Sequence, residues 1–197
     1  MARGYHLVTV TPWRRINLLG DLDAQVDEAI EGAARDVPPE VPPDQVGPLK
    51  RRMRDTMHAQ LVAARADGGL DFYYTAEEHH GFGYNATFVV SGVMSTTSSG
   101  REVAEALTEL FRQGDEPVSI GGTVWARRER TTAQEPAELV DGEVPSRRVD
   151  YTTSVPGAPR RWIQVTFSAI GDGDLVGLVV ELFDAMMSTW RWVREDD

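Results

Sequence analysis

The clearest pattern of hydrophobic and polar positions lies near the C-terminal end of the chain. Apolar and polar residues alternate through residues 147–155 and again through residues 160–169. The second run places four apolar residues on one side: Ile163, Val165, Phe167 and Ala169. Residues 156–159 (PGAP) separate the two runs, and such a cluster is a strong turn signal. The pattern predicts an antiparallel hairpin.

A helical periodicity follows the glycine- and aspartate-rich turn at residues 171–174 (GDGD). Two apolar stripes and one narrow polar stripe run along this segment. The apolar stripes consist of Leu175, Val179, Leu182 and Met186, and of Val176, Val180, Phe183 and Met187. Because two stripes of three are apolar, we expect a helix that is covered over most of its circumference, lying on a sheet with a neighbour beside it.

The same criteria predict further elements along the rest of the chain. We expect strands over 5–10, 13–19, 70–76, 84–94 and 118–125, and helices over 22–35, 48–66 and from Glu102 to near Gly114. Ser99 and Glu102 form a capping-box pattern before the last of these helices. Residues 37–48 are rich in proline and predict an extended, non-helical connector, and residues 131–143 predict a mobile loop.

Long hairpins and separate helices together indicate the α+β class. We predict one domain over residues 1–197, with a mostly antiparallel β-sheet flanked by helices.

Charge and composition narrow the classes of partner. The formal net charge is −11, which argues against non-specific binding of nucleic acid. Acidic residues gather in 21–44 and basic residues in 49–54. In one interpretation, these two segments face each other or solvent. In the other, they form two docking faces of opposite sign. Lysine occurs once, at Lys50, whereas arginine is frequent, as is typical of a GC-rich bacterial genome.

Targeting and redox signals are also informative. The chain has no cysteine, which excludes disulfides and thiolate metal sites. It has no run of eighteen apolar residues and no signal-peptide pattern at its start, so we expect a cytoplasmic protein without a membrane partner.

Candidate chemistry is sparse. Glu77, Glu78, His79 and His80 are the densest set of possible metal ligands, although their spacing matches no standard site and His6, His58 or a distant carboxylate would have to complete it. The 171–174 turn lacks most of the oxygens of a calcium loop, and the serine-rich residues 95–100 lack a phosphate-binding motif. We assign no catalytic residue, metal or cofactor from these patterns.

Aromatic residues at the end of the last helix are the candidate contact residues. Trp190 and Trp192 stand beside charged residues, where exposure is expected, and exposed aromatic side chains often anchor partners. They are therefore predicted to bind a protein partner.

The C-terminal block resembles a group of uncharacterised proteins from GC-rich bacteria. Those proteins end with a hairpin, a W-[IL]-x-[VL]-T-F-S strand and an LFDA-[IM]-M helix, matched here by residues 162–168 (WIQVTFS) and 182–187 (LFDAMM). Residues 13–16 (WRRI) and the paired helices after them also look similar. More distantly, the order of elements is similar to the Mog1/PsbP-like fold. This resemblance implies an accessory or binding module and transfers no functional residues.

Three functions follow as hypotheses. The preferred one is a non-catalytic accessory or protein-binding domain. The first alternative is a small-ligand or lipid-binding domain with an apolar cavity between the sheet and the long helix, which enlarging Ala169 or Ala185 would fill. The second alternative is a metal-dependent enzyme that uses the 77–80 loop.

Overall fold

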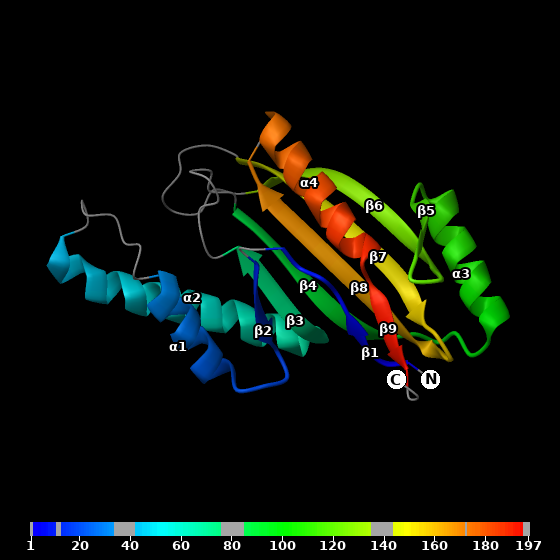
Figure 1. Cartoon of the computed structure of the whole chain (residues 1–197), viewed down its shortest axis with the longest axis horizontal. Coiled ribbons are helices and arrows are strands. Elements are labelled where there is room, and N and C mark those ends of the chain that lie inside the picture. Colours follow the sequence, from blue (N-terminus) through cyan, green and yellow to red (C-terminus); the bar gives the residue numbers. More distant parts are fainter. Residues whose placement is uncertain are drawn as a thin grey trace.

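The computed structural model describes residues 2–10, 13–33, 42–75, 85–134, 144–171 and 173–194. Over these residues the chain forms nine strands and four helices (Figure 1). The strands are β1 (Ala2–His6), β2 (Trp13–Asn17), β3 (Gly69–Thr75), β4 (Asn85–Met94), β5 (Glu116–Ile120), β6 (Thr123–Gln134), β7 (Val144–Val155), β8 (Ala158–Ile170) and β9 (Arg191–Arg194). The helices are α1 (Leu22–Ala33), α2 (Pro43–Ala66), α3 (Gly100–Arg112) and α4 (Gly173–Ser188).

Seven of the strands form one large sheet in the order β2-β3-β4-β8-β7-β6-β5, in which every neighbouring pair is antiparallel. Strands β1 and β9 form a separate antiparallel pair. The α+β class and the mostly antiparallel sheet are thereby confirmed. No helix of the described residues is long and apolar enough to cross a membrane.

The predicted C-terminal hairpin is confirmed as β7 and β8, the centre of the large sheet. Val149 pairs with Phe167 and Tyr151 with Val165, and all four side chains are buried. Gly157 has a φ of 77°, a left-handed conformation that favours glycine, so it closes the turn without strain. Each large apolar side chain buried in this way contributes about 1.5–3 kcal/mol.

Helix α4 covers one face of the sheet, hereafter the α4 face, and the β1–β9 pair continues that cover (Figure 1). Phe183 stacks on Phe167 with ring centroids 4.5 Å apart and tilts against Phe88 at 5.4 Å. The remaining buried residues of α4 are Val176, Val179, Val180, Met186 and Met187.

The expectation that α4 is covered over most of its circumference is wrong. Leu175 and Leu178 are 41% and 60% exposed, because no described helix lies beside α4 and its cover comes from the sheet beneath it. The helix therefore buries one side only.

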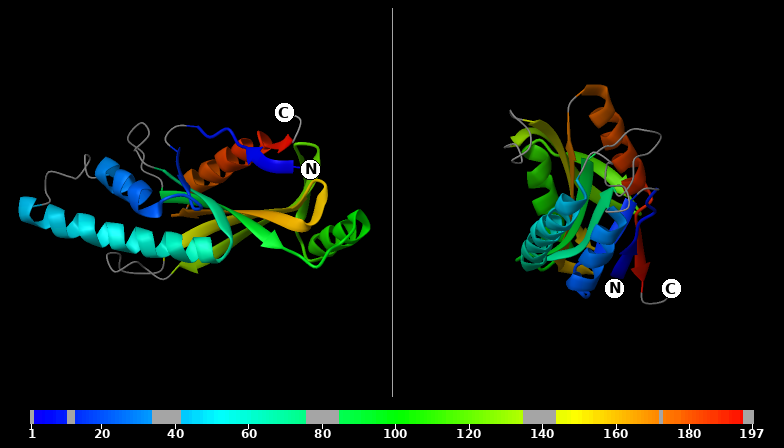
Figure 2. Two further views of the ribbon diagram at one scale, coloured as in Figure 1. Left: turned by 90° about the horizontal axis from the view of Figure 1, so that it is seen from below. Right: turned by 90° about the vertical axis from the view of Figure 1, so that its left-hand side faces the viewer.

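On the other face of the sheet, hereafter the opposite face, the described helices cover the two ends (Figure 2, left). Helices α1 and α2 pack on β2, β3 and β4 through a cluster that contains Ile16, Leu18, Leu22, Val26, Ile30 and Leu61. Helix α3 packs on β6 and β8 through Leu107, Ala126 and Trp162. Between these two clusters, no described helix covers the sheet.

The acidic and basic segments face each other, as one of the two interpretations predicted. Arg54 of α2 bonds to Asp27 at 2.6 Å and to Asp23 at 3.0 Å of α1, and Lys50 lies 3.4 Å from Glu31. Because these pairs are largely exposed, they contribute little to the stability of the fold.

The proline-rich connector was predicted too long. Helix α2 begins at Pro43 and continues through Pro48, so residues 43–48 are helical rather than extended. Pro42 precedes the helix with φ −57° and ψ 137°, and a proline in the first turn loses no helical hydrogen bond. Pro48 forgoes one such bond inside the helix. Residues 37–41 lie outside the described residues.

One predicted strand is a hairpin. The segment 118–125 divides into β5 and β6 at Gly121 and Gly122, whose φ values of 58° and 74° are typical of a two-residue hairpin turn. Strand β6 then continues to Gln134, so residues 131–134 of the predicted loop are strand, and residues 135–143 lie outside the described residues.

The chain termini also differ from expectation. The first strand covers Ala2–His6 rather than 5–10, and β9 was not predicted.

At α3 one half of the predicted capping box is confirmed. The hydroxyl of the N-cap residue Ser99 accepts from the Glu102 N–H at 3.3 Å. The Glu102 carboxylate accepts from the Ser98 N–H at 2.8 Å, one residue before the N-cap, rather than from the N–H of Ser99 as a capping box requires.

Candidate functional site

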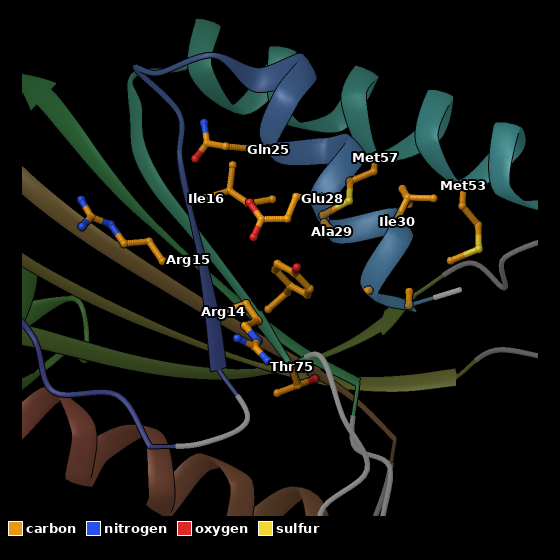
Figure 3. A pocket seen from close by; sticks show the side chains of 13 residues that line it. Arg14, Arg15, Ile16, Gln25, Glu28, Ala29, Ile30, Met53, Met57 and Thr75 are labelled. Carbon is orange, nitrogen blue, oxygen red and sulfur yellow. The ribbon is translucent and has the colours of Figure 1, made fainter. Parts of the chain in front are cut away.

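A groove of about 680 Å³ lies between α1, α2 and the outer strands β2 and β3 (Figure 3). We call it the α1 groove. Its lining residues are Arg14, Arg15, Ile16, Gln25, Glu28, Ala29, Ile30, Gly32, Ala33, Met53, Met57, Tyr74 and Thr75.

The groove follows from the way α1 packs. Its buried stripe of Leu22, Val26 and Ile30 holds the helix against β2 and α2. The adjacent stripe of Gln25, Glu28 and Gly32, at helical spacing, therefore lines the groove. A methyl group added at Gly32 would meet no atom within 4 Å, so the space beside it is open.

The lining is amphipathic. Met53 is 41% exposed and Met57 is half-buried, and both enter from α2. Arg14 of β2 lies at one end beside Thr75, whereas Glu28 of α1 points toward the middle (Figure 3). Burial raises the pKa of Tyr74, the positive charge of Arg14 acts in the other direction, and Glu28 adds to the increase. The phenol therefore stays neutral and can donate or accept a hydrogen bond.

The groove runs along the free edge of the large sheet, since β2 pairs on one side only with the strands that the structure describes. The Leu18 N–H donates to the Leu70 carbonyl of β3. Along an antiparallel ladder, residues whose peptide groups bond to the neighbouring strand alternate with residues whose peptide groups point away from it. The peptide groups of Asn17 and Arg15 therefore point away from β3. The Gln25 side chain closes this edge at Asn17: its Oε1 accepts from the Asn17 N–H at 2.8 Å and its Nε2 donates to the Asn17 carbonyl at 3.0 Å.

The Arg15 peptide group is left open at the same edge, since no described residue caps it. The side chain of Arg15 crosses to the α4 face, where its Nε and Nη2 atoms each lie 2.8 Å from Oδ1 of the buried Asp71. Tyr5 donates to the other oxygen of Asp71. Burial is the largest of several effects that raise the pKa of Tyr5 far above its usual value, so Tyr5 remains a donor. These bonds fix β2 in one position, which makes the open peptide group a rigid feature.

The expected exposure of Trp190 is wrong. The side chain is 0% exposed, because the chain turns after α4 into β9 and carries Trp190 into the core. It stacks on Tyr5 with ring centroids 4.2 Å apart and meets the edge of Trp125 at 5.2 Å. Trp190 therefore has no surface to offer a partner.

Trp192 is half-buried and stacks on Trp125 at 6.1 Å, and its Nε1 donates to Thr123 at 3.0 Å. It keeps some exposed surface, so its role in partner binding stays a prediction.

The other candidate residues are dispersed or undescribed. Glu77, Glu78, His79 and His80 lie outside the described residues. Among the residues that the structure does describe, no three histidine or acidic side chains come together as a metal site. Ala185, where a larger side chain was expected to fill a cavity, lies on the exposed side of α4, whereas Ala169 is buried in the core.

No protein-family model matches the chain, and no curated protein matches it significantly. The groove was not predicted from the sequence, although the stripe of Gln25, Glu28 and Gly32 beside the buried stripe of α1 was the available signal.

Proposed function

We propose that this chain is a non-catalytic binding domain that takes an extended segment of a protein partner along the free edge of β2. The observation that carries the proposal is the α1 groove, which runs beside the open Arg15 peptide group. Main-chain bonds at a sheet edge provide affinity for an extended peptide, and pockets for alternate side chains provide specificity.

The lining of the groove suits such a segment. Side chains of an extended peptide alternate between two sides, so every second one would enter the groove. Met53 and Met57 offer a flexible, polarisable surface that adapts to different apolar side chains. Arg14 and Glu28 offer charges of opposite sign for polar side chains on either flank.

An accessory role also agrees with the resemblance to the Mog1/PsbP-like fold, which we keep as part of the proposal. Domains of that kind are generally binding modules. The antiparallel sheet with flanking helices is the part of the resemblance that the structure supports.

A small amphipathic ligand is the second candidate. The volume of about 680 Å³ falls within the range of roughly 300–1,000 Å³ that is usual for small-molecule sites. Because charged residues line the groove, such a ligand would carry polar groups as well as an apolar part, rather than a plain acyl chain.

Affinity purification from the source cell with two matched variants tests the proposal. Met53→Glu places a charge in the groove, and Val62→Glu places the same charge on the same helix outside it, at a position that is 44% exposed against 41% for Met53. We expect the protein recovered with the wild-type chain to be kept by Val62→Glu and lost by Met53→Glu. Recovery of no specific protein, or equal recovery by both variants, contradicts the proposal.

The binding mode is tested at Arg15. Arg15→Pro removes the outward N–H, which a sheet edge tolerates, and Arg15→Ala keeps it. Both variants lose the ion pair with Asp71, so they form a matched pair. Strand addition predicts that Arg15→Ala retains the partner and that Arg15→Pro releases it. If both variants bind equally, the partner does not pair with β2.

A further inference from the structure

Three arginines gather on the opposite face of the sheet, far from β2 in the strand order. Arg128 and Arg130 are two residues apart on β6 and so point to the same side. Arg148 of β7 stands directly opposite Arg130, and Asp150 stands opposite Arg128. Like charges in opposite positions destabilise a sheet unless other groups compensate them.

Asp150 holds two of these arginines in place. The residue is 5% exposed, and its carboxylate accepts from Arg130, from Arg148 Nε at 3.1 Å and from the Thr166 hydroxyl at 2.7 Å. Gln164 donates to it at 3.4 Å. Burial alone would raise the pKa of Asp150, but the bonds from Thr166 and the arginines outweigh burial and lower the pKa. The group is therefore a carboxylate at neutral pH.

The cluster keeps a positive charge. Among the described residues, Arg128 pairs with Asp115, and Asp150 alone pairs with both Arg130 and Arg148. Within this part of the chain three guanidinium groups therefore face two carboxylates, which leaves one positive charge uncompensated by the described residues, although the chain as a whole has a net charge of −11. Nη2 of Arg128 is buried and has no hydrogen-bond partner among the described residues.

The unused donors are accessible. Each guanidinium has five N–H donors, and Asp150 engages only part of those on Arg130 and Arg148. Their side chains are 46% and 42% exposed, and no described helix covers this part of the sheet. The bonds to Asp150 fix both guanidinium groups, so a ligand would not have to order them.

We propose that Arg128, Arg130 and Arg148 form a site for a single phosphate group carried by a small molecule. A phosphate brings three acceptor oxygens and about two negative charges, which suits several guanidinium groups at once. A carboxylate brings only two acceptor oxygens, and the carboxylate of Asp150 already accepts hydrogen bonds from Arg130 and Arg148. One uncompensated charge also suits one phosphate rather than a polyanion, which the net charge of the chain repels.

The site is independent of the α1 groove, because none of its residues lines the groove. Loss of phosphate binding would therefore leave the proposed partner binding intact. Loss of partner binding would likewise leave phosphate binding intact.

Nuclear magnetic resonance of the wild-type protein tests the site directly. Inorganic phosphate is titrated at constant ionic strength while the Nε–H signals of the arginines are followed. We expect saturable shifts at Arg130 and Arg148, and none at Arg101, which is 84% exposed on α3. Shifts that do not saturate, or that are equal at Arg101, overturn the proposal. Equal saturation by acetate at matched ionic strength overturns the assignment to phosphate.

A pair of variants supplies the second measurement. By calorimetry, Arg130→Gln should bind inorganic phosphate roughly tenfold more weakly, the usual loss for one charged hydrogen bond. Arg112→Gln, which removes an equally charged and 71% exposed side chain from α3, should bind as the wild type does. Undiminished affinity in Arg130→Gln contradicts the site. If that variant does not fold, the wild-type titration decides.

Discussion

The two faces of the large sheet differ in what covers them. The α4 face is closed by an aromatic core in which Phe88, Phe167, Phe183 and Trp125 are each 0% exposed. The described helices cover the opposite face at its ends, and between them its residues include threonine, serine, glutamine, arginine and the buried Asp150. Strands that alternate strictly can support both surfaces at once, because successive side chains point to opposite faces.

The difference separates stability from binding. A closed apolar face contributes most of the hydrophobic free energy of folding, and its residues have no surface for a partner. Both the α1 groove and the arginine cluster lie on the opposite face or at its edge. Substitutions on the two faces should therefore have different consequences.

The largest effect is expected from Val180→Asp. Val180 lies on the buried side of α4 and is 4% exposed, so the variant buries a carboxylate without a partner and should unfold the domain. Thermal denaturation followed by circular dichroism measures this. Glu181→Lys, on the exposed side of the same helix, is the control and should change the stability by no more than about 0.5 kcal/mol. A Val180→Asp variant as stable as wild type would show that α4 is not buried.

A large but graded loss is expected from Phe183→Ala. The side chain contacts Phe88, Phe167 and Tyr151, and the cavity left behind should cost about 3–5 kcal/mol. Leu178→Ala on the same helix removes an apolar side chain that is 60% exposed, and should cost less than about 1 kcal/mol. Chemical denaturation compares them. Equal losses would mean that Leu178 is covered in solution.

A pH-dependent effect is expected from Asp150→Asn. The pKa of Asp150 is lowered in the folded state, so the carboxylate contributes stability above its unfolded-state pKa of about 3.9, and this contribution is lost as the pH falls through the folded-state pKa. The variant's free energy of unfolding at pH 7 should be lower by about 1–3 kcal/mol, and it should fall less steeply than that of the wild type as the pH decreases. Denaturation between pH 2 and pH 7 measures both. If the stability of the variant fell as steeply with decreasing pH as that of the wild type, the Asp150 carboxylate would not be the group that stabilises the fold.

The smallest effect is expected from Gln25→Ala. Two hydrogen bonds at the edge of β2 are lost, at a cost of about 1 kcal/mol, because the exposed peptide group of Asn17 can bond to water instead. Hydrogen exchange of the Asn17 amide should become faster, whereas that of Leu18, which bonds to Leu70, should not change. Unchanged exchange at Asn17 would mean that Gln25 does not cap the edge.

The sequence predicted the central hairpin and most helices because their signals are local. Alternation in β7 and β8, and the N-cap at Ser99, need no knowledge of distant contacts. The Gly121-Gly122 turn was also a local signal, and the continuous apolar pattern on either side concealed it.

Features that depend on distant residues were not predictable in this way. Trp190 is buried because Tyr5, at the other end of the sequence, stacks on it. Leu175 and Leu178 are exposed because no described helix lies beside α4, which helical periodicity alone does not reveal. The arginine cluster needs the register of β6 against β7, and the α1 groove needs the packing of α1 on the edge of the sheet.

Hydrogen exchange of the complex tests the central claim most directly, namely that this domain binds its partner at the β2 edge and not on the α4 side. The wild-type chain is compared with and without the protein recovered with it. We expect slower exchange in β2, in α1 and around Met53 to Met57, with no change in α4 or β9. Protection confined to the exposed side of α4 or to Trp192, with β2 and α1 unchanged, would contradict it.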